Sequence, residues 1–274
     1  PLAPNEHVNK TFLTTENLYD FGPLLVGKTK DRLRPNKYPD NIDKLKIINP
    51  RPYKIEVNFS LKESEGVNGT FSLDQNKIIL DPKSHAWLSV FAFPKTQGRY
   101  EDTIVCEIKD NPEPINFSIS CTAVKPEVEV DKKQVQFEKL LLHRKNTQKL
   151  TLTNPTAITI AWRLAAMENL GDEISASRDY GTIAPHSKHE ITFTFRAIKP
   201  INLKRTIRVE IGDIDNVLGV CQTEAVQVIG EAYDVALDMS FPRGADGGLD
   251  FGTVQVFEEC KQACALKNKG KYEI

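Results

Sequence analysis

Apolar and polar residues alternate along much of this chain with the period of two that is typical of β-strands. The segment Ile191–Phe195, for example, reads apolar, polar, apolar, polar, apolar. Similar runs recur about every ten residues and are separated by glycine or proline, which punctuate strands in antiparallel folds. The pattern therefore predicts an all-β chain with little helix.

A longer pattern repeats three times: an aromatic tripeptide, then a polar stretch, an alternating apolar strand and an asparagine. The tripeptides are Asp20-Phe21-Gly22, Gln136-Phe137-Glu138 and Asp250-Phe251-Gly252, and the asparagines are Asn49, Asn154 and Asn268. The phenylalanines are 116 and 114 positions apart, and the first copy carries an 11-residue insertion before its asparagine. A repeat of this length indicates tandem domains.

The repeat divides the chain into four parts. We expect residues 1–14 to be a leader or the end of a preceding unit, residues 15–124 and 125–233 to be complete domains, and residues 234–274 to be the opening strands of a third. About seven strands fit each complete copy, which suits a two-sheet β-sandwich. The joints Lys125-Pro126 and Tyr233-Asp234 are short, so the sequence predicts an extended, semi-rigid rod that continues beyond Ile274.

The alternation also predicts which side chains form the core. In the second copy the expected core residues are Leu150, Leu152, Trp162, Ile191, Phe193 and Phe195. Cys264 of the third copy takes the register position of Leu45 and Leu150, so it is expected to face inward, and Cys260 to be more exposed.

Charge and hydropathy exclude several classes of function. Lys+Arg number 36 and Asp+Glu 37, so the net charge of −1 gives no drive toward nucleic acid or anionic lipid. No apolar run approaches the ~20 residues of a membrane span, and no signal peptide opens the chain at Pro1, which indicates a fragment. We expect neither nucleic acid nor membrane as a partner, and no small-molecule substrate.

The five cysteines do not form a disulfide pattern. They are Cys106, Cys121, Cys221, Cys260 and Cys264. The second strands of copies one and two carry leucine and isoleucine where a secreted sandwich of immunoglobulin type places a cysteine. Reduced thiols and a cytoplasmic location are therefore favoured.

Candidate chemistry is sparse. His186 and His189 form an H-x-x-H pattern at a turn, without a helical register or a third ligand. Cys260 and Cys264 are explained by a loop thiol and a small buried side chain. Nucleophile-elbow and phosphate-loop motifs are missing, so the sequence predicts no enzyme, no cofactor and no metal site.

One stretch is unusually basic. The insertion in the first copy holds Lys28, Lys30, Arg32, Arg34 and Lys37, against only two aspartates. A solvated loop is the simpler interpretation, and a contact with an acidic protein surface is the functional one.

These features together resemble the ASH-type and major-sperm-protein-type domains that occur in tandem in ciliary proteins. The resemblance is carried by the early Asp-Phe-Gly, by the pairs Asn49-Pro50 and Asn154-Pro155, by the mid-domain proline turn, and by the last strand Val228–Ala232. It implies tandem immunoglobulin-like, seven-stranded β-sandwiches in a non-enzymatic scaffold of the motile-cilium axoneme. The implied partners are proteins of its central pair apparatus, and tubulin is a further candidate.

Two other classes remain open at this point. One is a cytoplasmic adaptor that captures short peptides on a strand edge or in a basic groove. The other is a secreted adhesion module, which would require oxidised cysteines.

Overall fold

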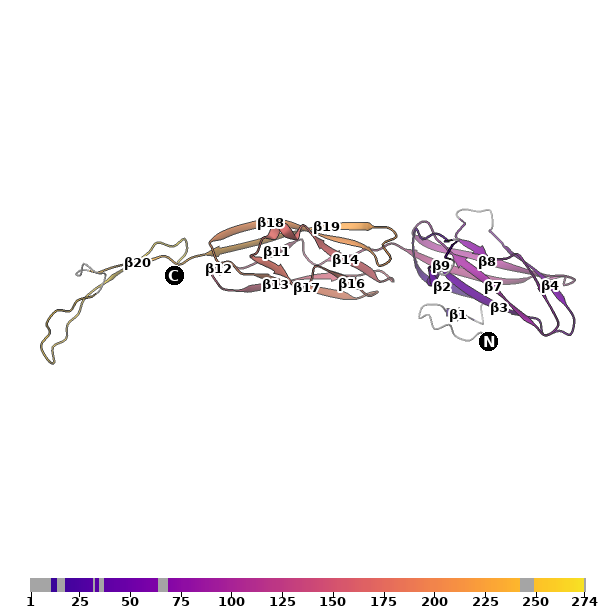
Figure 1. Ribbon diagram of the computed structural model, residues 1–274, viewed down its shortest axis with the longest axis horizontal. Helices are drawn as coiled ribbons and strands as arrows, with labels where there is room; N and C mark the ends of the chain where they lie inside the picture. The colour runs from indigo at the N-terminus through magenta and orange to yellow at the C-terminus, as the bar shows by residue number, and fades with distance from the viewer. Residues whose placement is uncertain are drawn as a thin grey trace.

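The computed structural model describes residues 11–13, 18–31, 33–34, 37–63, 69–241 and 249–273. Two β-sandwiches and a thin C-terminal segment follow one another along the long axis in chain order (Figure 1). We call them the first unit (β1–β9), the second unit (β10–β19) and the C-terminal strand pair (β20–β21). Of the expected leader, only Thr11–Leu13 is described.

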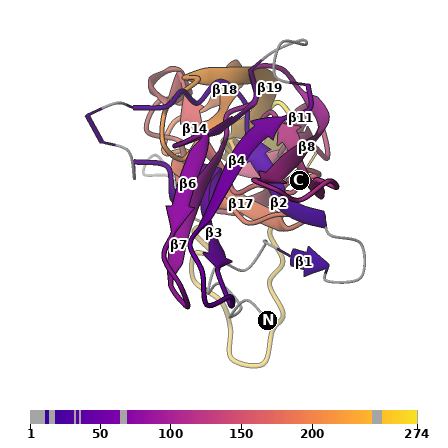
Figure 2. The same cartoon turned by 90° about the vertical axis from the view of Figure 1, so that its right-hand side faces the viewer.

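The first unit contains a six-stranded and a three-stranded sheet. The larger sheet has the order β1 (Thr11–Leu13), β2 (Leu18–Leu25), β9 (Ile115–Val124), β8 (Gly98–Ile108), β4 (Ile55–Leu61) and β6 (Lys77–Leu80). The smaller sheet has the order β3 (Ile42–Ile48), β7 (His85–Ala92) and β5 (Phe71–Leu73), and the 3-10 turn η1 (Pro39–Asn41) leads into β3. Figure 2 looks along the molecule onto this unit.

The second unit repeats this plan. Its smaller sheet has the order β10 (Glu129–Val130), β13 (Asn146–Thr153), β17 (Lys188–Phe195) and β15 (Ile174–Ala176). Its larger sheet has the order β11 (Gln134–Gln136), β19 (Val220–Tyr233), β18 (Ile201–Asp213), β14 (Ile160–Ala165) and β16 (Tyr180–Ile183), with β12 (Leu140–Leu141) also on β19 and the turn η2 (Met167–Leu170) after β14. The strands outnumber the expected seven because the first strand is split and short edge strands are added.

The first strand of the second unit links the two sheets. Its first half, β10, pairs with β13 so that Val130 lies opposite Leu152, whereas its second half, β11, pairs in parallel with β19 so that Gln134 lies opposite Gln227. The first unit has the same parallel closure between β2 and β9. Each unit is therefore closed by pairing its opening strand with its last strand.

Each unit has its own core. One cluster of buried apolar residues lies between the sheets of the first unit and a second cluster between those of the second unit. The six core residues expected in the second copy are all buried, with Trp162 at 2% exposure and the other five at 0%. Alternation at a period of two predicted them correctly because every second side chain of a strand faces the opposing sheet.

The repeated asparagine has the same structural role in both sandwiches. The Asn154 Nδ2 donates to the carbonyls of Ile158, Ile183 and Ala184, and its Oδ1 accepts from the N–H of Thr156. Asn49 makes the corresponding set of bonds in the first unit. The fully buried amide thus provides hydrogen-bond donors for backbone carbonyls in the loop that follows its strand and at the start of the proline turn.

The Asp-Phe-Gly tripeptide makes the same local hydrogen bond in two copies, and in the first copy this bond lies within β2. The N–H of Gly22 donates to Asp20 Oδ1, and the N–H of Gly252 donates to Asp250 Oδ1. Both glycines have positive φ, near 74° and 63°, which a residue with a Cβ adopts only with strain. The second copy has Gln136 and Glu138 in place of the aspartate and the glycine, and no such bond is made there in the part of the chain that the structure describes.

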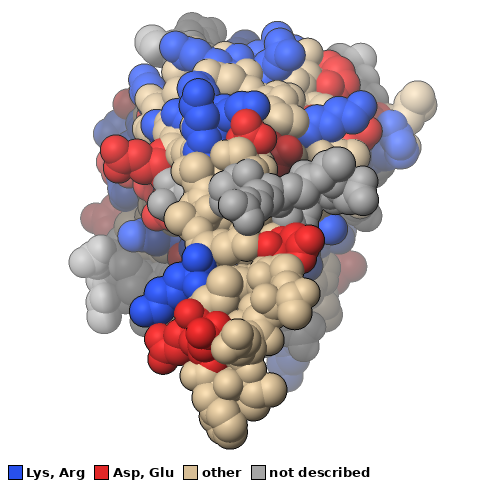
Figure 3. All heavy atoms as spheres, turned by 90° about the vertical axis from the view of Figure 1, so that its left-hand side faces the viewer, with Lys and Arg blue, Asp and Glu red and all other residues tan. Residues whose placement is uncertain are grey.

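The C-terminal strand pair differs from the prediction. β20 (Leu237–Ser240) and β21 (Ala265–Asn268) pair with each other, and the repeated tripeptide residues Asp250 and Phe251 are in neither strand. Cys264, expected to face inward, is exposed, as Cys260 is. No second sheet among the described residues lies over this pair, so no core forms around Cys264. Seen from this end, acidic and basic side chains are interspersed (Figure 3).

Candidate protein-contact site

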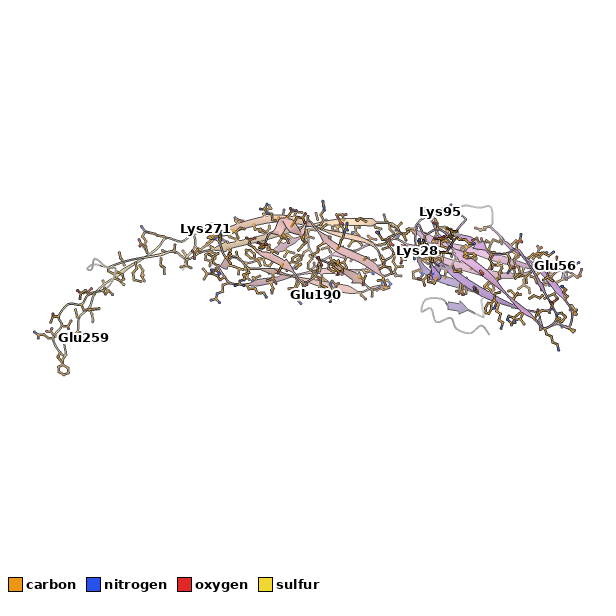
Figure 4. The ribbon with its side chains drawn as sticks, viewed as in Figure 1. Lys28, Glu56, Lys95, Glu190, Glu259 and Lys271 are labelled. Carbon is orange, nitrogen blue, oxygen red and sulfur yellow. The ribbon has the colours of Figure 1, made fainter. Side chains whose placement is uncertain are left out.

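The basic insertion connects β2 to β3, and its first lysine lies inside the molecule. Lys28 is 8% exposed, and its Nζ lies 2.9 Å from Asp215 Oδ2 of the second unit. The same ammonium lies 4.8 Å from the ring centroid of Tyr38. Figure 4 shows Lys28 at the end of the first unit that faces the second. Lys28 therefore holds the joint and does not contribute to an exposed basic patch.

The other cations of the insertion do not form one cluster. Lys30 Nζ lies 3.4 Å from the ring centroid of Phe91, and Lys37 Nζ lies 4.8 Å from that of Tyr38. Arg34 is exposed and contacts Asp31, and Arg32 lies outside the described residues. Cation–π contacts leave an ammonium charged and able to bind an anion, so Lys30, Lys37 and Arg34 remain candidates for a contact.

Asp31 fixes the local shape of the loop. Its Oδ1 accepts hydrogen bonds from the backbone N–H groups of Leu33 and Arg34, and its Oδ2 lies 3.3 Å from Arg34 Nε. These backbone bonds, first that of Arg34, hold the pKa of the Asp31 carboxyl below its usual value. The carboxylate stays charged at neutral pH and partly neutralises Arg34, which lowers the net charge that the loop presents.

The two units touch directly at the joint. Gly27 has φ near 78°, and a Cβ at this position would lie 2.8 Å from Leu218 Cδ2 of the second unit. The loop that carries Leu218 is shaped by Asp213, whose two carboxylate oxygens accept the N–H groups of Val217 and Leu218 at 2.8 Å each. The positive φ thus favours glycine at position 27, and the short distance shows that Leu218 of the neighbouring unit packs directly against it.

A cavity of about 310 Å³ lies at this joint. Residues from both units line it: Pro23, Lys28, Asp40 and Asn41 from the first, and Ile158, Pro185, Asp213 and Asp215 from the second. In its polar lining, Lys28 pairs with Asp215 and Asp213 holds its own loop, whereas the buried Asn41 Oδ1 has no hydrogen-bond partner among the described residues. We interpret it as a gap in the packing of the joint.

The remaining chemical candidates have structural surroundings. His186 lies on the turn, whereas His189 lies in β17 with its ring centroid 5.1 Å from that of Trp162. Burial raises the pKa of the Cys106 thiol to about 11 and that of Cys121 to about 12, which keeps both protonated. Within the described ranges, no three histidine, cysteine or acidic side chains are grouped as metal ligands. No described helix is long and apolar enough to span a bilayer.

Sequence reasoning placed the five cations together but missed the joint. Asp213 ends β18, and Asp215 and Leu218 lie in the loop between β18 and β19, where nothing in the local pattern points to the first unit. The only available signal was the short linker at Lys125-Pro126, which requires neighbouring units to touch.

Comparison with known proteins gives a relationship over the whole chain. The chain is 43% identical over 273 residues to the human hydrocephalus-inducing protein homolog and 42% identical over 269 residues to the mouse hydrocephalus-inducing protein. These matches cover 100% and 98% of this chain but only 5% of each relative. No family model matches the chain.

Solved structures give weaker similarities. A PapD-like (ASH) domain of human CEP192 aligns over 40% of this chain and 87% of its own length, with 17% identity and a TM-score of 0.36. SSP-19, an MSP-domain-like protein of Caenorhabditis elegans, aligns over 37% of this chain and 96% of its own length, with 12% identity and a TM-score of 0.30.

Proposed function

Because the whole chain is related to one stretch of the hydrocephalus-inducing proteins, we propose that it is a non-enzymatic structural segment of the motile-cilium axoneme, within the central pair apparatus. The proposed location is the cytoplasm, in the ciliary cytoskeleton. The observation that carries the proposal is the closed joint between two sandwiches, with the Lys28–Asp215 ion pair and the Gly27–Leu218 contact. A segment built in this way spaces and orients binding surfaces.

The proposed partners are central-apparatus proteins and the acidic surface of tubulin. Loops on rigid sandwiches vary without disturbing the core, and they commonly carry binding residues. Lys30, Arg34 and Lys37 of the insertion, together with Arg32, supply the positive charge for such a contact. Exposed charges are screened over about 8 Å at physiological salt, so this loop steers and orients an assembly whose affinity comes from many units.

Cosedimentation with microtubules or salt-washed axonemes tests the proposal. We expect the triple substitution Lys30→Glu, Arg32→Glu and Arg34→Glu to weaken association about tenfold or more at low salt, with an unchanged melting temperature. A matched triple charge reversal on the second unit, at the exposed residues Lys199, Lys204 and Arg205, serves as control. Equal binding by the loop variant and the unmodified protein at low salt would refute the contact.

A further inference from the structure

Among the described residues, no strand covers the outer edge of β3 in the first unit at Lys44, Lys46 and Ile48. In its three-stranded sheet β3 is paired on one side with β7, and no described strand is paired with its other side. In Figure 2, β3 lies beside β7, and β1 is placed apart from it, in the sheet of β2. An uncovered edge presents backbone donors and acceptors to an extended segment of another chain.

The outward-facing groups of this edge follow from its pairing. The N–H of Asn49 donates to the carbonyl of Ser84 on the β7 side. Alternate residues of a strand direct their backbone groups to opposite sides, so Lys44, Lys46 and Ile48 direct theirs away from β7. The side chains of these three residues are also exposed, and Lys46 Nζ lies 5.8 Å from the ring centroid of Trp87.

The second unit shows what covers the same edge. Counting back from the repeated asparagines, Thr151 takes the place of Lys46. The Thr151 carbonyl accepts from the N–H of Asp131 at 3.1 Å, and its own N–H donates to Asp131 Oδ1 at 2.9 Å. The covering segment includes β10 and reads Pro126-Glu-Val-Glu-Val-Asp131, in which acidic and valine residues alternate.

The direction of these side chains explains the alternation. Val130 lies opposite the buried Leu152 and packs against the core, whereas Glu129 lies opposite Thr153 and is exposed. On β3 the side chains of Lys44 and Lys46 are exposed in the same way. Those of Leu45 and Ile47 face inward and belong to the core of the first unit. The edge of β3 is therefore more basic than that of β13, with the same apolar inner side.

We propose that the β3 edge binds an extended antiparallel segment of a partner protein in which acidic and β-branched apolar residues alternate. The acidic side chains lie beside Lys44 and Lys46, and the apolar ones cover the side of the core next to Leu45 and Ile47. Backbone hydrogen bonds to Lys44, Lys46 and Ile48 supply the affinity, and the alternate side chains supply the specificity. The lysines also repel a second copy of the same edge, which selects against self-association.

A peptide with the sequence of residues 126–131 extended by Val-Glu, so that acidic residues fall opposite both Lys46 and Lys44, is the probe; it is acetylated, amidated and fluorescently labelled. We expect saturable binding by fluorescence anisotropy to the full chain, and at least tenfold weaker binding to the variant Lys44→Glu, Lys46→Glu. The charge-reversed control at Lys199 and Lys204 should bind as the unmodified protein does. A peptide with lysine in place of each acidic residue should not bind.

N-methylation of the peptide separates strand addition from simple charge attraction. By analogy with Asp131, methyl groups on the N–H groups of the acidic residues should abolish binding, and methyl groups on the valine N–H groups should change it less than threefold. Equal effects of the two methylation patterns would overturn the proposal. So would binding that occurs only after deletion of residues 1–16, because the edge would then be covered by the chain itself.

Discussion

Replacing Asn154 by alanine should destabilise the second unit more than any surface substitution. The side chain has 0% exposure, and its Nδ2 donates to three carbonyls at 2.8, 3.1 and 3.0 Å. Its Oδ1 accepts from the N–H and the hydroxyl of Thr156 at 2.9 and 2.7 Å. At about 1 kcal/mol net for each bond, with buried carbonyls left unpaired, the expected loss is roughly 3–5 kcal/mol of unfolding free energy.

Urea unfolding followed by tryptophan fluorescence measures this loss. The chain has two tryptophans, and substituting the half-exposed Trp87 by phenylalanine leaves Trp162, in the core of the second unit, as the sole reporter. With a slope of about 1–3 kcal/mol per molar urea, the midpoint should fall by about 2 M. The exposed Asn202→Ala, on β18 of the same unit, provides a matched control.

The third copy supplies an internal comparison. Asn268 Nδ2 donates only to the carbonyl of Tyr272 among the described residues, and the side chain is exposed. Asn268→Ala should therefore shift the urea midpoint reported by Trp162 fluorescence by less than about 0.3 M, which is the size of effect expected of a surface substitution. A loss below about 1 kcal/mol for Asn154→Ala, or a loss equal to that of Asn202→Ala, would refute the role assigned to the repeated amide.

Three further predictions concern the core, the thiols and the C-terminal joint. Trp162→Ala should cost about 3–5 kcal/mol in urea unfolding followed by far-UV circular dichroism, because an indole that is 2% exposed leaves a large cavity. A maleimide should label Cys264, which is exposed, within minutes and leave Cys121 unlabelled until the protein unfolds, since burial raises the Cys121 pKa to about 12. Lys271 and Tyr272 lower the pKa of Glu231, so this contact should persist above pH 4.5 and weaken as the pH falls through the lowered pKa, which NMR titration of Glu231 measures.

Strands with strict alternation were predictable from the sequence, and short edge strands were not. The run around Leu150 and Leu152 was identified because one face of its strand is buried. β16 was missed because it is a short edge strand in which only Ile183 is buried and Tyr180 is 72% exposed, so the hydrophobic pattern contains little information. Its existence depends on pairing with β14, which is a tertiary contact.

The contact site was predictable only in composition. The sequence identified five cations in one insertion, but the partner that buries Lys28 is Asp215, 187 positions away in another unit. Cys264 was wrongly expected to face inward, because register identifies the inner side of a strand but does not provide the opposing sheet that buries it. The edge of β3 that no described strand covers could be recognised only from the pairing of β10 in the second unit.

The closure of each sandwich by its opening and last strands also determines when each unit can fold. Leu18 lies opposite Ser118 and Gln134 opposite Gln227, so the two closing pairs join residues 100 and 93 positions apart. Contacts this distant in sequence make folding slow. At a synthesis rate of about 5–20 residues per second, each opening strand stays unpaired for roughly 5–20 s before its partner strand has been synthesised. A preceding unit that has already closed has no free last strand to offer, so the order of synthesis protects neighbouring repeats from exchanging strands.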